Sequence, residues 1–412
     1  MFGPVSVTRN AYRARGWGRL FPADAALNLP DGLHSHGLRR LAAIESARGS
    51  FDDARDAICR ATGQVIGKRQ LERLAHDAAV DFQAFYAQRP QPQTVDPDPD
   101  ARVQVISCDG KGIVMRPGAL RAPTQRQAER SEHKLATRLS RGEKRNRKRI
   151  AEVGAVYEIT PVPRTARDIL PASSTGNDPV TQGPVAKQKW LTASVSSDAA
   201  AVIAGVFDEA HRRDPNHTRK WIALVDGNNH QIDRITREAA ARGLDVPILI
   251  DFVHVIEYLW KAAWCFHPEG DPAAEGWVHH HAQKILAGHA TRVAGAIRRQ
   301  ATNARLDASK RAAADTTAKY LTSKSRYLDY PTALTAGWPI ATGVIEGACR
   351  HLVKDRMDIT GARWGLPGAE AILKLRAIHA NHDFEKYWAY HLTQEHRRVH
   401  EPRYAPPDSR PS

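Results

Sequence analysis

The chain has 412 residues, 42% of them hydrophobic, so it is long enough for two or three domains with a substantial core. Its 60 Lys and Arg against 45 Asp and Glu give a formal net charge of +15. This excess favours a polyanionic partner, nucleic acid or an anionic membrane surface, over a neutral metabolite. No apolar run reaches the roughly 18 residues that a membrane span needs, and the start "MFGPVSVTRN" has no signal-peptide pattern. The four cysteines are scattered without a C-x-x-C pair, which argues against a disulfide framework or a cysteine zinc site and favours the cytoplasm.

The first 88 residues predict a helical region. "SFDDARDAICRATG" opens with Ser50 as an N-cap and ends at Gly63, and "GKRQLERLAHDAAVDFQAFY", 67–86, predicts a second helix with one apolar face. Two helices joined by a short glycine-containing turn suit a helix-turn-helix over about 50–88, with an ordinary helical hairpin as the alternative. In the DNA-reading interpretation, three basic residues at the start of the second helix contact DNA: Lys68, Arg69 and Arg73.

Beyond this region the chain predicts an α/β domain with a helical insertion. "RPQPQTVDPDPD", 89–100, is a Pro/Asp linker, and the apolar runs after it alternate with amphipathic helical patterns, which is typical of a mixed sheet. The expected strands are "VQVISCD", "AEVGAVYEI", "KWLTASV", "WIALVDG" and "VPILIDF". We therefore expect a first core part over 101–254, an all-helical insertion over 255–336, a second core part over 337–392 and a basic tail over 393–412.

Residues 116–150 hold most of the excess charge. Twelve Lys and Arg against three Glu give this segment +9 of the chain's +15, and "RGEKRNRKR", 141–149, is its densest part. Such a cluster favours contact with phosphates, and a solvated basic loop is the alternative. The candidate phosphate-binding residues are Arg141, Lys144, Arg145, Arg147, Lys148 and Arg149.

Three acids are candidates for a metal site. Asp109 in "VQVISCDGKGIVM" and Asp226 in "KWIALVDGNNHQ" each follow an apolar run and precede a glycine, and Glu346 lies on a predicted helix, "TGVIEGACRHLVKDRM". Two strand-end aspartates and a helical glutamate can hold two Mg²⁺ or Mn²⁺ ions, which activate a water or a 3′-hydroxyl and stabilise the leaving oxygen in an attack on phosphorus. Asp251, after "VPILI", is also at a strand end, and residue chemistry alone leaves the choice between it and Asp226 open. Arg350 and Lys354 fall on the helical face of Glu346 and are expected to hold a DNA backbone.

Several long segments resemble ISKra-type insertion-sequence transposases, which are Mutator-related DDE transposases with an RNase H-like core. The resemblance runs from about residue 21 to residue 404. The segments that carry it are "CDGKGIVM", "KLATRLSRGEKRNRKR", "EVGAVYEITPVPRT", "LVDGNNHQ" and "GVIEGACRHLVKDRMDITGARWGLPGAEAILKLRA".

The resemblance implies that Asp109, Asp226 and Glu346 are the catalytic, metal-binding triad. The first acid would lie on the first strand, the second just after the fourth strand, and the glutamate on a late helix beyond a helical insertion. "DFVH" resembles the [CD]-x-x-H motif of Mutator-related transposases, which implies that Asp251 and His254 support the site rather than bind its metals.

The implied function is DNA transposition: metal-dependent cleavage of element ends and strand transfer, with terminal inverted repeats and target DNA as partners. We expect a cytoplasmic, nucleoid-associated protein that acts as a homodimer or larger assembly on DNA. Relatives usually carry a cysteine-rich, zinc-ribbon-like segment before "FPADAALNLP", and here that segment has no cysteine pairs. This departure motivates a second hypothesis, a catalytically inactive or truncated DNA-binding remnant. An RNase H-like nuclease is the third.

Overall fold

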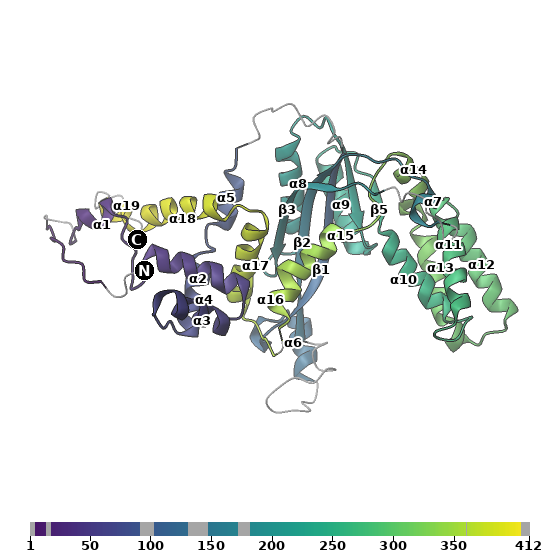
Figure 1. Ribbon diagram of the computed structural model, residues 1–412, viewed down its shortest axis with the longest axis horizontal. Coiled ribbons are helices and arrows are strands. Elements are labelled where there is room, and N and C mark those ends of the chain that lie inside the picture. Colours follow the sequence, from purple (N-terminus) through teal and green to yellow (C-terminus); the bar gives the residue numbers. More distant parts are fainter. Residues whose placement is uncertain are drawn as a thin grey trace.

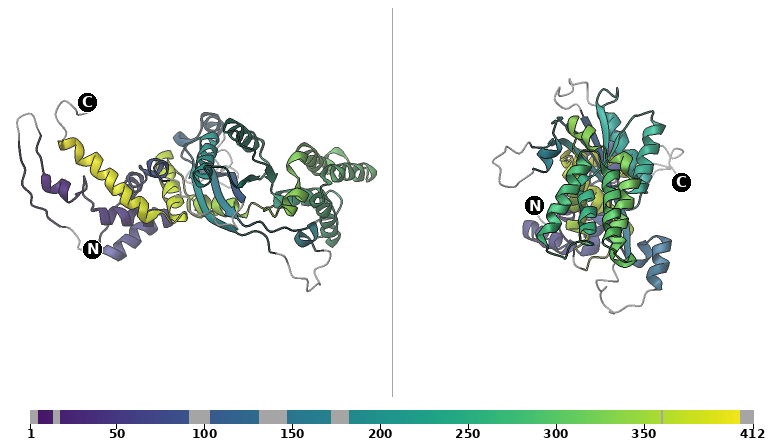
Figure 2. Two further views of the ribbon diagram at one scale, coloured as in Figure 1. Left: turned by 90° about the horizontal axis from the view of Figure 1, so that it is seen from above. Right: turned by 90° about the vertical axis from the view of Figure 1, so that its right-hand side faces the viewer.

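The computed structural model describes residues 5–13, 18–90, 103–130, 147–171, 182–359 and 361–404. Figure 1 shows an elongated molecule with a central sheet, a group of N-terminal helices on one side and a helical arm on the other. Figure 2 shows the same three parts from two further directions. The protein is thus a mixed α/β structure, as the sequence predicts.

The central sheet has five described strands in the order β3-β2-β1-β4-β5, one for each strand that the sequence predicts. β1 pairs with β2 antiparallel and with β4 parallel, β2 pairs with β3 antiparallel, and β4 pairs with β5 parallel. The sheet is therefore mixed, with its antiparallel half on one side of β1 and its parallel half on the other. The strands are β1 (Val103–Val114), β2 (Lys148–Ile159), β3 (Ala186–Ser194), β4 (Lys220–Val225) and β5 (Ile248–Ile250).

Helices cover both faces of this sheet. α8 (Ala199–Arg213) lies so close to β2 that a Cβ on Gly154 would fall 2.4 Å from Val206 Cγ2. On the other face, α17 (Leu366–Ala380) packs against β3. The remaining helices of this region are η1 (Pro117–Ala119), α6 (Ala122–Glu129), α7 (Ala166–Ile169), α9 (Asn229–Ala241), α15 (Gly343–Ala348), η4 (Cys349–Lys354) and α16 (Asp355–Met357).

The N-terminal helices form a small unit with a core of its own, and the C-terminal helix packs against it. The Ser50 capping box and the left-handed Gly63 C-cap occur as predicted. The helix expected over 67–86 is wrong as one element, because α4 ends at Asp77 and α5 begins at Phe82. The helices are α1 (Pro22–Ala26), α2 (His36–Arg48), α3 (Phe51–Thr62), α4 (Lys68–Asp77), α5 (Phe82–Ala87), α18 (Phe384–Val399) and α19 (Glu401–Tyr404).

The break between α4 and α5 has a visible cause in α18. Buried Asp81 accepts hydrogen bonds from His391 and Arg398, and the Tyr387 hydroxyl donates to the Ala78 carbonyl oxygen. These contacts hold the backbone of residues 78–81 in a turn. α18 also runs through residue 393, where we expected the tail to begin, because its apolar face packs on α5.

The described residues of the expected insertion form helices joined by short connections and contain no strand. This arm begins at Phe252, with Asp251 as the N-cap whose side chain accepts a hydrogen bond from Val253 N–H. No helix among the described residues is long and apolar enough to cross a membrane. The arm consists of α10 (Phe252–Ala263), α11 (Pro272–Leu286), α12 (Ala290–Asn303), α13 (Ala308–Ser323), η3 (Ser325–Tyr327) and α14 (Tyr330–Thr335).

Candidate active site

Asp109 lies within β1 rather than at its end, so the expected strand-end position is wrong. The antiparallel pairing with β2 continues through Asp109 opposite Val153 as far as Val114 opposite Lys148. On the other side, the parallel pairing with β4 stops at Ile106 opposite Ala223. Asp109 is therefore inside the antiparallel half of the sheet but beyond the last paired residues of the parallel half, where a side chain can face open space.

Asp226 follows β4 directly, as predicted. Continuing the β1–β4 register by three residues places Asp109 level with Asp226 on the neighbouring parallel strand. The chain then turns at Gly227, whose φ of +93° favours glycine, and Asp226 Oδ1 accepts a hydrogen bond from Asn228 N–H at 2.8 Å. The two aspartates thus meet at one edge of the sheet.

The electrostatics of Asp109 reflect this pairing. Burial raises the pKa of its carboxyl, the hydrogen bonds from Cys349 and from Gly110 N–H oppose the rise, and the like charge of Asp226 adds to it. Of the basic groups, Lys111 lowers this pKa. A carboxylate in such surroundings is stabilised by any cation that can approach it.

Glu346 lies on α15, and the residue that follows this helix contacts Asp109. Cys349, three residues later, donates its thiol hydrogen to Asp109 Oδ2 at an Sγ–O distance of 3.3 Å. Glu346 itself is exposed, and Thr342 Oγ1 lies 3.4 Å from its Oε1. The helix that carries the glutamate therefore touches the first aspartate through a thiol.

Arg350 and Lys354 do not share a continuous α-helical face with Glu346, which corrects the interpretation of their spacing. The helix changes to π-helical geometry over η4 (Cys349–Lys354), so the 3.6-residue period no longer relates these positions. Both side chains are exposed, and Arg350 Nε lies 3.7 Å from Asp355 Oδ1. They remain candidates for DNA contact because their side chains are exposed, and not because they share a helical face with Glu346.

Asp251 is adjacent to Asp226 at the same sheet edge, since its N–H donates to the Val225 carbonyl oxygen. It is only 1% exposed, and both of its carboxylate oxygens are engaged, Oδ1 by Val253 N–H and Oδ2 by the Thr342 hydroxyl. The same hydroxyl faces Glu346, so Asp251 is linked to the glutamate through Thr342. Half-buried Asp226 is the more accessible of the two aspartates that the sequence left as alternatives.

His254, the other expected supporting residue, faces an aromatic group. Its ring lies 5.4 Å from Tyr258 and 6.1 Å from Tyr320, and these two tyrosines stack at 4.0 Å. The Tyr320 hydroxyl donates to the main-chain oxygen of Asp226 at 3.3 Å. His254 therefore adjoins the Asp226 turn through Tyr320, and its charge lowers the pKa of Asp251.

Two charged residues near the acids escaped the sequence analysis. Glu152 lies on β2 opposite Gly110, and burial raises the pKa of its carboxyl, with Asp109 and Asp226 adding to the rise. Lys324, 7% exposed at the end of α13, donates to Asn229 Oδ1, and Asp226 partly offsets the lowering of its pKa by burial. The burial of Lys324 could not be predicted from the local sequence, because it depends on how the helical arm packs near Asp226.

Carboxylates are suitable ligands for a divalent cation, but Asp109, Asp226 and Glu346 are not close enough together to form a complete metal site. Within the described ranges no group of three or more His, Cys, Asp or Glu is placed to hold a metal ion. Asp109 and Asp226 supply hard oxygen ligands at one edge, whereas Glu346 points to Thr342. A metal bound here would take its protein ligands from the aspartate pair, and Glu346 would have to approach it.

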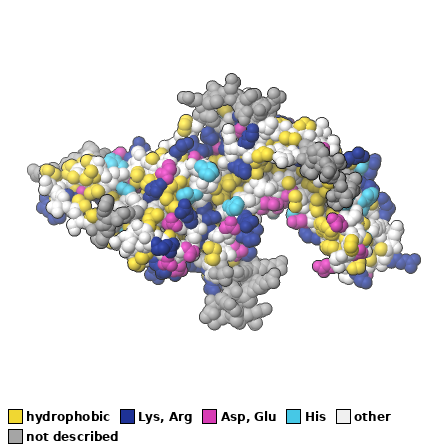
Figure 3. Space-filling view, in the orientation of Figure 1, with side chains coloured by type: hydrophobic (Ala, Val, Ile, Leu, Met, Phe, Trp, Pro, Cys, Tyr) yellow, Lys and Arg dark blue, Asp and Glu magenta, His cyan; other side chains and the backbone are white. Residues whose placement is uncertain are grey.

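The predicted DNA-contacting residues fall into two groups. Lys68, Arg69 and Arg73 are exposed on α4, and Lys68 forms an ion pair with Asp52 at 2.7 Å. Figure 3 shows Lys and Arg side chains spread along the visible face and mixed with acids, rather than gathered in one patch.

The second group is the cluster at 141–149. Arg141, Lys144 and Arg145 lie outside the described residues. Arg147 is buried, and the partly exposed Arg149 donates to the carbonyl oxygens of Val195 and Ala119, so the main chain already engages its guanidinium. Of Arg147, Lys148 and Arg149, only Lys148, the first residue of β2, is fully exposed.

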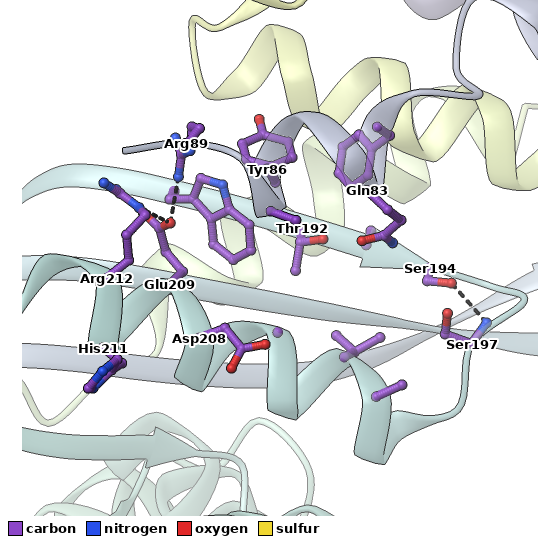
Figure 4. Close-up of a pocket in the computed structure, with 17 residues that line it drawn as sticks. Gln83, Tyr86, Arg89, Thr192, Ser194, Ser197, Asp208, Glu209, His211 and Arg212 are labelled. Atoms are coloured by element: carbon purple, nitrogen blue, oxygen red, sulfur yellow. Dashed lines mark hydrogen bonds and ion pairs between the residues drawn. The ribbon is translucent and has the colours of Figure 1, made fainter. Parts of the chain in front are cut away.

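A groove of about 700 Å³ opens at the β3 edge of the sheet, between α5, β3 and α8. None of the predicted acids lines it. Figure 4 shows Glu209 at its end, bridged to Arg89 and Arg212. Arg213 is a third partner of this carboxylate, at 2.8 Å. Although burial alone would raise it, the pKa of Glu209 is lowered to about 2 by these arginines.

No protein-family model matches the chain, and no curated protein matches it. The geometry above and the motifs in the sequence are therefore what a functional proposal rests on.

Proposed function

We propose that the protein is the DNA transposase of an insertion sequence, with an RNase H-like core and an Asp-Asp-Glu triad formed by Asp109, Asp226 and Glu346. The single observation that carries the proposal is that Asp109, on β1, and Asp226, directly after the neighbouring parallel strand β4, lie close enough for the charge of Asp226 to raise the pKa of Asp109. Far apart in the chain, these acids reach one sheet edge.

Further support comes from the order of the elements. The resemblance requires the first acid on the first strand, the second just after the fourth strand and the glutamate on a late helix beyond an insertion. Asp109 is on β1, Asp226 follows β4, and Glu346 is on α15 after the arm α10–α14. This order of the elements supports the proposal.

The role that we propose for each residue follows from its contacts and its exposure. Asp109 and Asp226 would hold Mg²⁺ or Mn²⁺, and two such ions supply an activated nucleophile and charge stabilisation at the phosphorus. Thr342 and Asp251 orient the turn that precedes Glu346, and Cys349 keeps the glutamate-bearing helix against Asp109. Glu346 is exposed, which leaves it free to approach once cation and DNA are bound.

DNA would be held by basic side chains outside the triad. Exposed Lys68, Arg69 and Arg73 on α4 suit a helix-turn-helix role, and exposed Arg350 and Lys354 lie just beyond the glutamate. A transposase pairs two element ends, so the DNA complex is a homodimer or larger. The scattered cysteines favour the cytoplasm, and a DNA partner favours association with the nucleoid.

The test uses the purified chain, Mn²⁺ and DNA carrying the element's terminal inverted repeats. Asp109→Asn, Asp226→Asn and Glu346→Gln should each reduce end cleavage and strand transfer by about three orders of magnitude or more, with DNA affinity kept. Asp233→Asn, an exposed aspartate on α9 in an ion pair with Arg237, is the matched control and should keep activity. Full strand transfer by the Asp109 and Glu346 variants contradicts the proposal.

One observation favours the inactive DNA-binding alternative. The three carboxylates are not gathered into a metal-binding group among the described residues. That alternative predicts DNA binding without any nicking in Mn²⁺. The RNase H-like nuclease predicts cleavage without joining and without preference for the terminal repeats, so the same assay separates all three.

A further inference from the structure

A small cavity lies on the boundary between the N-terminal helices and the helix that follows Glu346. It has a volume of about 270 Å³. Figure 1 shows α17 between the N-terminal helices and the α15–α16 segment. Residues of α17 form part of the cavity wall. Every polar side chain that lines it is basic, and no described acidic side chain does. The lining residues are Ala47, Arg48, His351, Leu352, Arg376, His379 and Ala380.

Arg376 brings a positive charge that no carboxylate neutralises. Its guanidinium donates to the main-chain oxygens of Ala47, His351 and Leu352. These bonds occupy three of its five N–H groups. No carboxylate of the described residues lies within ion-pair distance of it, and burial lowers its pKa, against the weaker pull of Asp355. Carbonyl oxygens satisfy hydrogen bonds but carry no full charge, so an anion would stabilise this side chain further.

His379 adds an unsatisfied polar atom. Its Nε2 is buried and has no hydrogen-bond partner among the described residues, and its ring stacks on Phe384 at 4.3 Å. Burial, together with the charges of Arg48, Arg376 and Arg40, lowers its pKa to about 4, so the ring is neutral at pH 7. A neutral imidazole with hydrogen on Nε2 is a donor that lacks an acceptor here.

The remaining basic side chains have acidic partners outside the cavity wall. Arg48 pairs with Glu45 at 3.2 Å yet is 71% exposed, and His351 Nδ1 lies 3.2 Å from Asp355 Oδ2. A water molecule could satisfy His379, but it could not neutralise Arg376. A tetrahedral anion with several oxygens can accept from both residues and from Arg48 at once.

We propose that this cavity binds a phosphate group, either of a nucleic-acid backbone or of free phosphate. With a nucleic-acid source, the inference rests on the proposed function and adds a phosphate contact between the N-terminal helices and the glutamate-bearing helix. With free phosphate, it stands without that function. Neither the metal-binding acids nor any cleavage step takes part.

The experiment is isothermal titration of the full chain with inorganic pyrophosphate, in EDTA and at constant ionic strength. The wild type should give a saturable one-site curve. His379→Asn, which removes Nε2, and Arg48→Gln should each weaken it about tenfold, the effect of losing one charge-assisted contact. Arg298→Gln, an exposed arginine on α12, should change nothing. Absence of saturable binding by the wild type, or wild-type affinity in both the His379 and the Arg48 variant, overturns the proposal.

A second arm identifies the source of the phosphate. If DNA supplies it, the same two variants weaken duplex binding and pyrophosphate competes with DNA. If free phosphate supplies it, the duplex affinity of the two variants stays at the wild-type value while their pyrophosphate affinity falls about tenfold. Both experiments are done without divalent cations. A negative result would therefore not argue against metal binding by Asp109 and Asp226, and an inactive triad would not argue against the phosphate site.

Discussion

Two carboxylates against the same sheet have opposite surroundings. Glu209, on α8, is buried among Arg89, Arg212 and Arg213, and its pKa falls to about 2. Asp109, on β1, is partly buried beside another aspartate, and its pKa is raised by burial and by that neighbour. The first carboxylate contributes to stability through its partners. The second is an unneutralised acid that the fold tolerates, which is expected of a functional site.

The largest stability effect should come from the neutralised carboxylate. Glu209→Gln removes the buried charge that Arg89, Arg212 and Arg213 share and should reduce the free energy of unfolding by about 3 kcal/mol at pH 7. Because the folded pKa is depressed, this stabilisation is complete above pH 4.5 and is lost as the pH falls toward 2. Urea unfolding at several pH values measures the difference.

Its control is Glu385→Gln, since Glu385 is 75% exposed in its pair with Arg40. That variant should stay within about 0.5 kcal/mol of the wild type. Equal losses in the two variants would contradict the contrast between buried and exposed ion pairs.

A second, intermediate effect should appear at the turn that carries Asp226. A Cβ on Gly227 would lie 2.6 Å from the Tyr320 hydroxyl at a φ of +93°, so Gly227→Ala should cost about 2 kcal/mol. Tyr320→Phe removes the nearest clashing atom, and a double-mutant cycle should show a smaller loss in its background. Additive losses would show that Tyr320 does not restrain the turn. Gly276→Ala, in an open helical position, should be neutral or stabilising.

The smallest effect should be a gain in stability at the unneutralised acid. Without metal, Asp109→Asn should raise the melting temperature at pH 7 by less than Glu209→Gln lowers it. Because the folded pKa of Asp109 is raised, its ionised form costs stability above that pKa, and the cost disappears as the pH falls below 3.8. The gain should therefore grow with pH in calorimetry in EDTA, and a variant less stable than wild type at every pH would contradict this reasoning.

Much of the fold could be predicted from local patterns. The five strands are runs of apolar and β-branched residues bounded by turns, and helix α3 begins and ends at its capping residues. What failed depends on distant partners. β1 extends past Asp109 because β2 pairs with it there, and α4 ends early because α18 holds Asp81.

The same distinction applies to the candidate site. The residue types of Asp109, Asp226 and Glu346 and their motif context mark them in the sequence. The π-helical segment after Glu346 and the burial of Lys324 beside Asp226 arise only from packing. The choice between Asp226 and Asp251 also needed tertiary contacts, because only these show that both oxygens of Asp251 are engaged.

The most direct test of the central claim is Mn²⁺ binding followed by electron paramagnetic resonance, without DNA or turnover. The claim is that Asp109 and Asp226 together form a cation site at the sheet edge. We predict saturable binding by the wild type, loss of that binding in Asp109→Asn and Asp226→Asn, and wild-type affinity in Asp233→Asn. Unchanged Mn²⁺ affinity in the first two variants would contradict the claim.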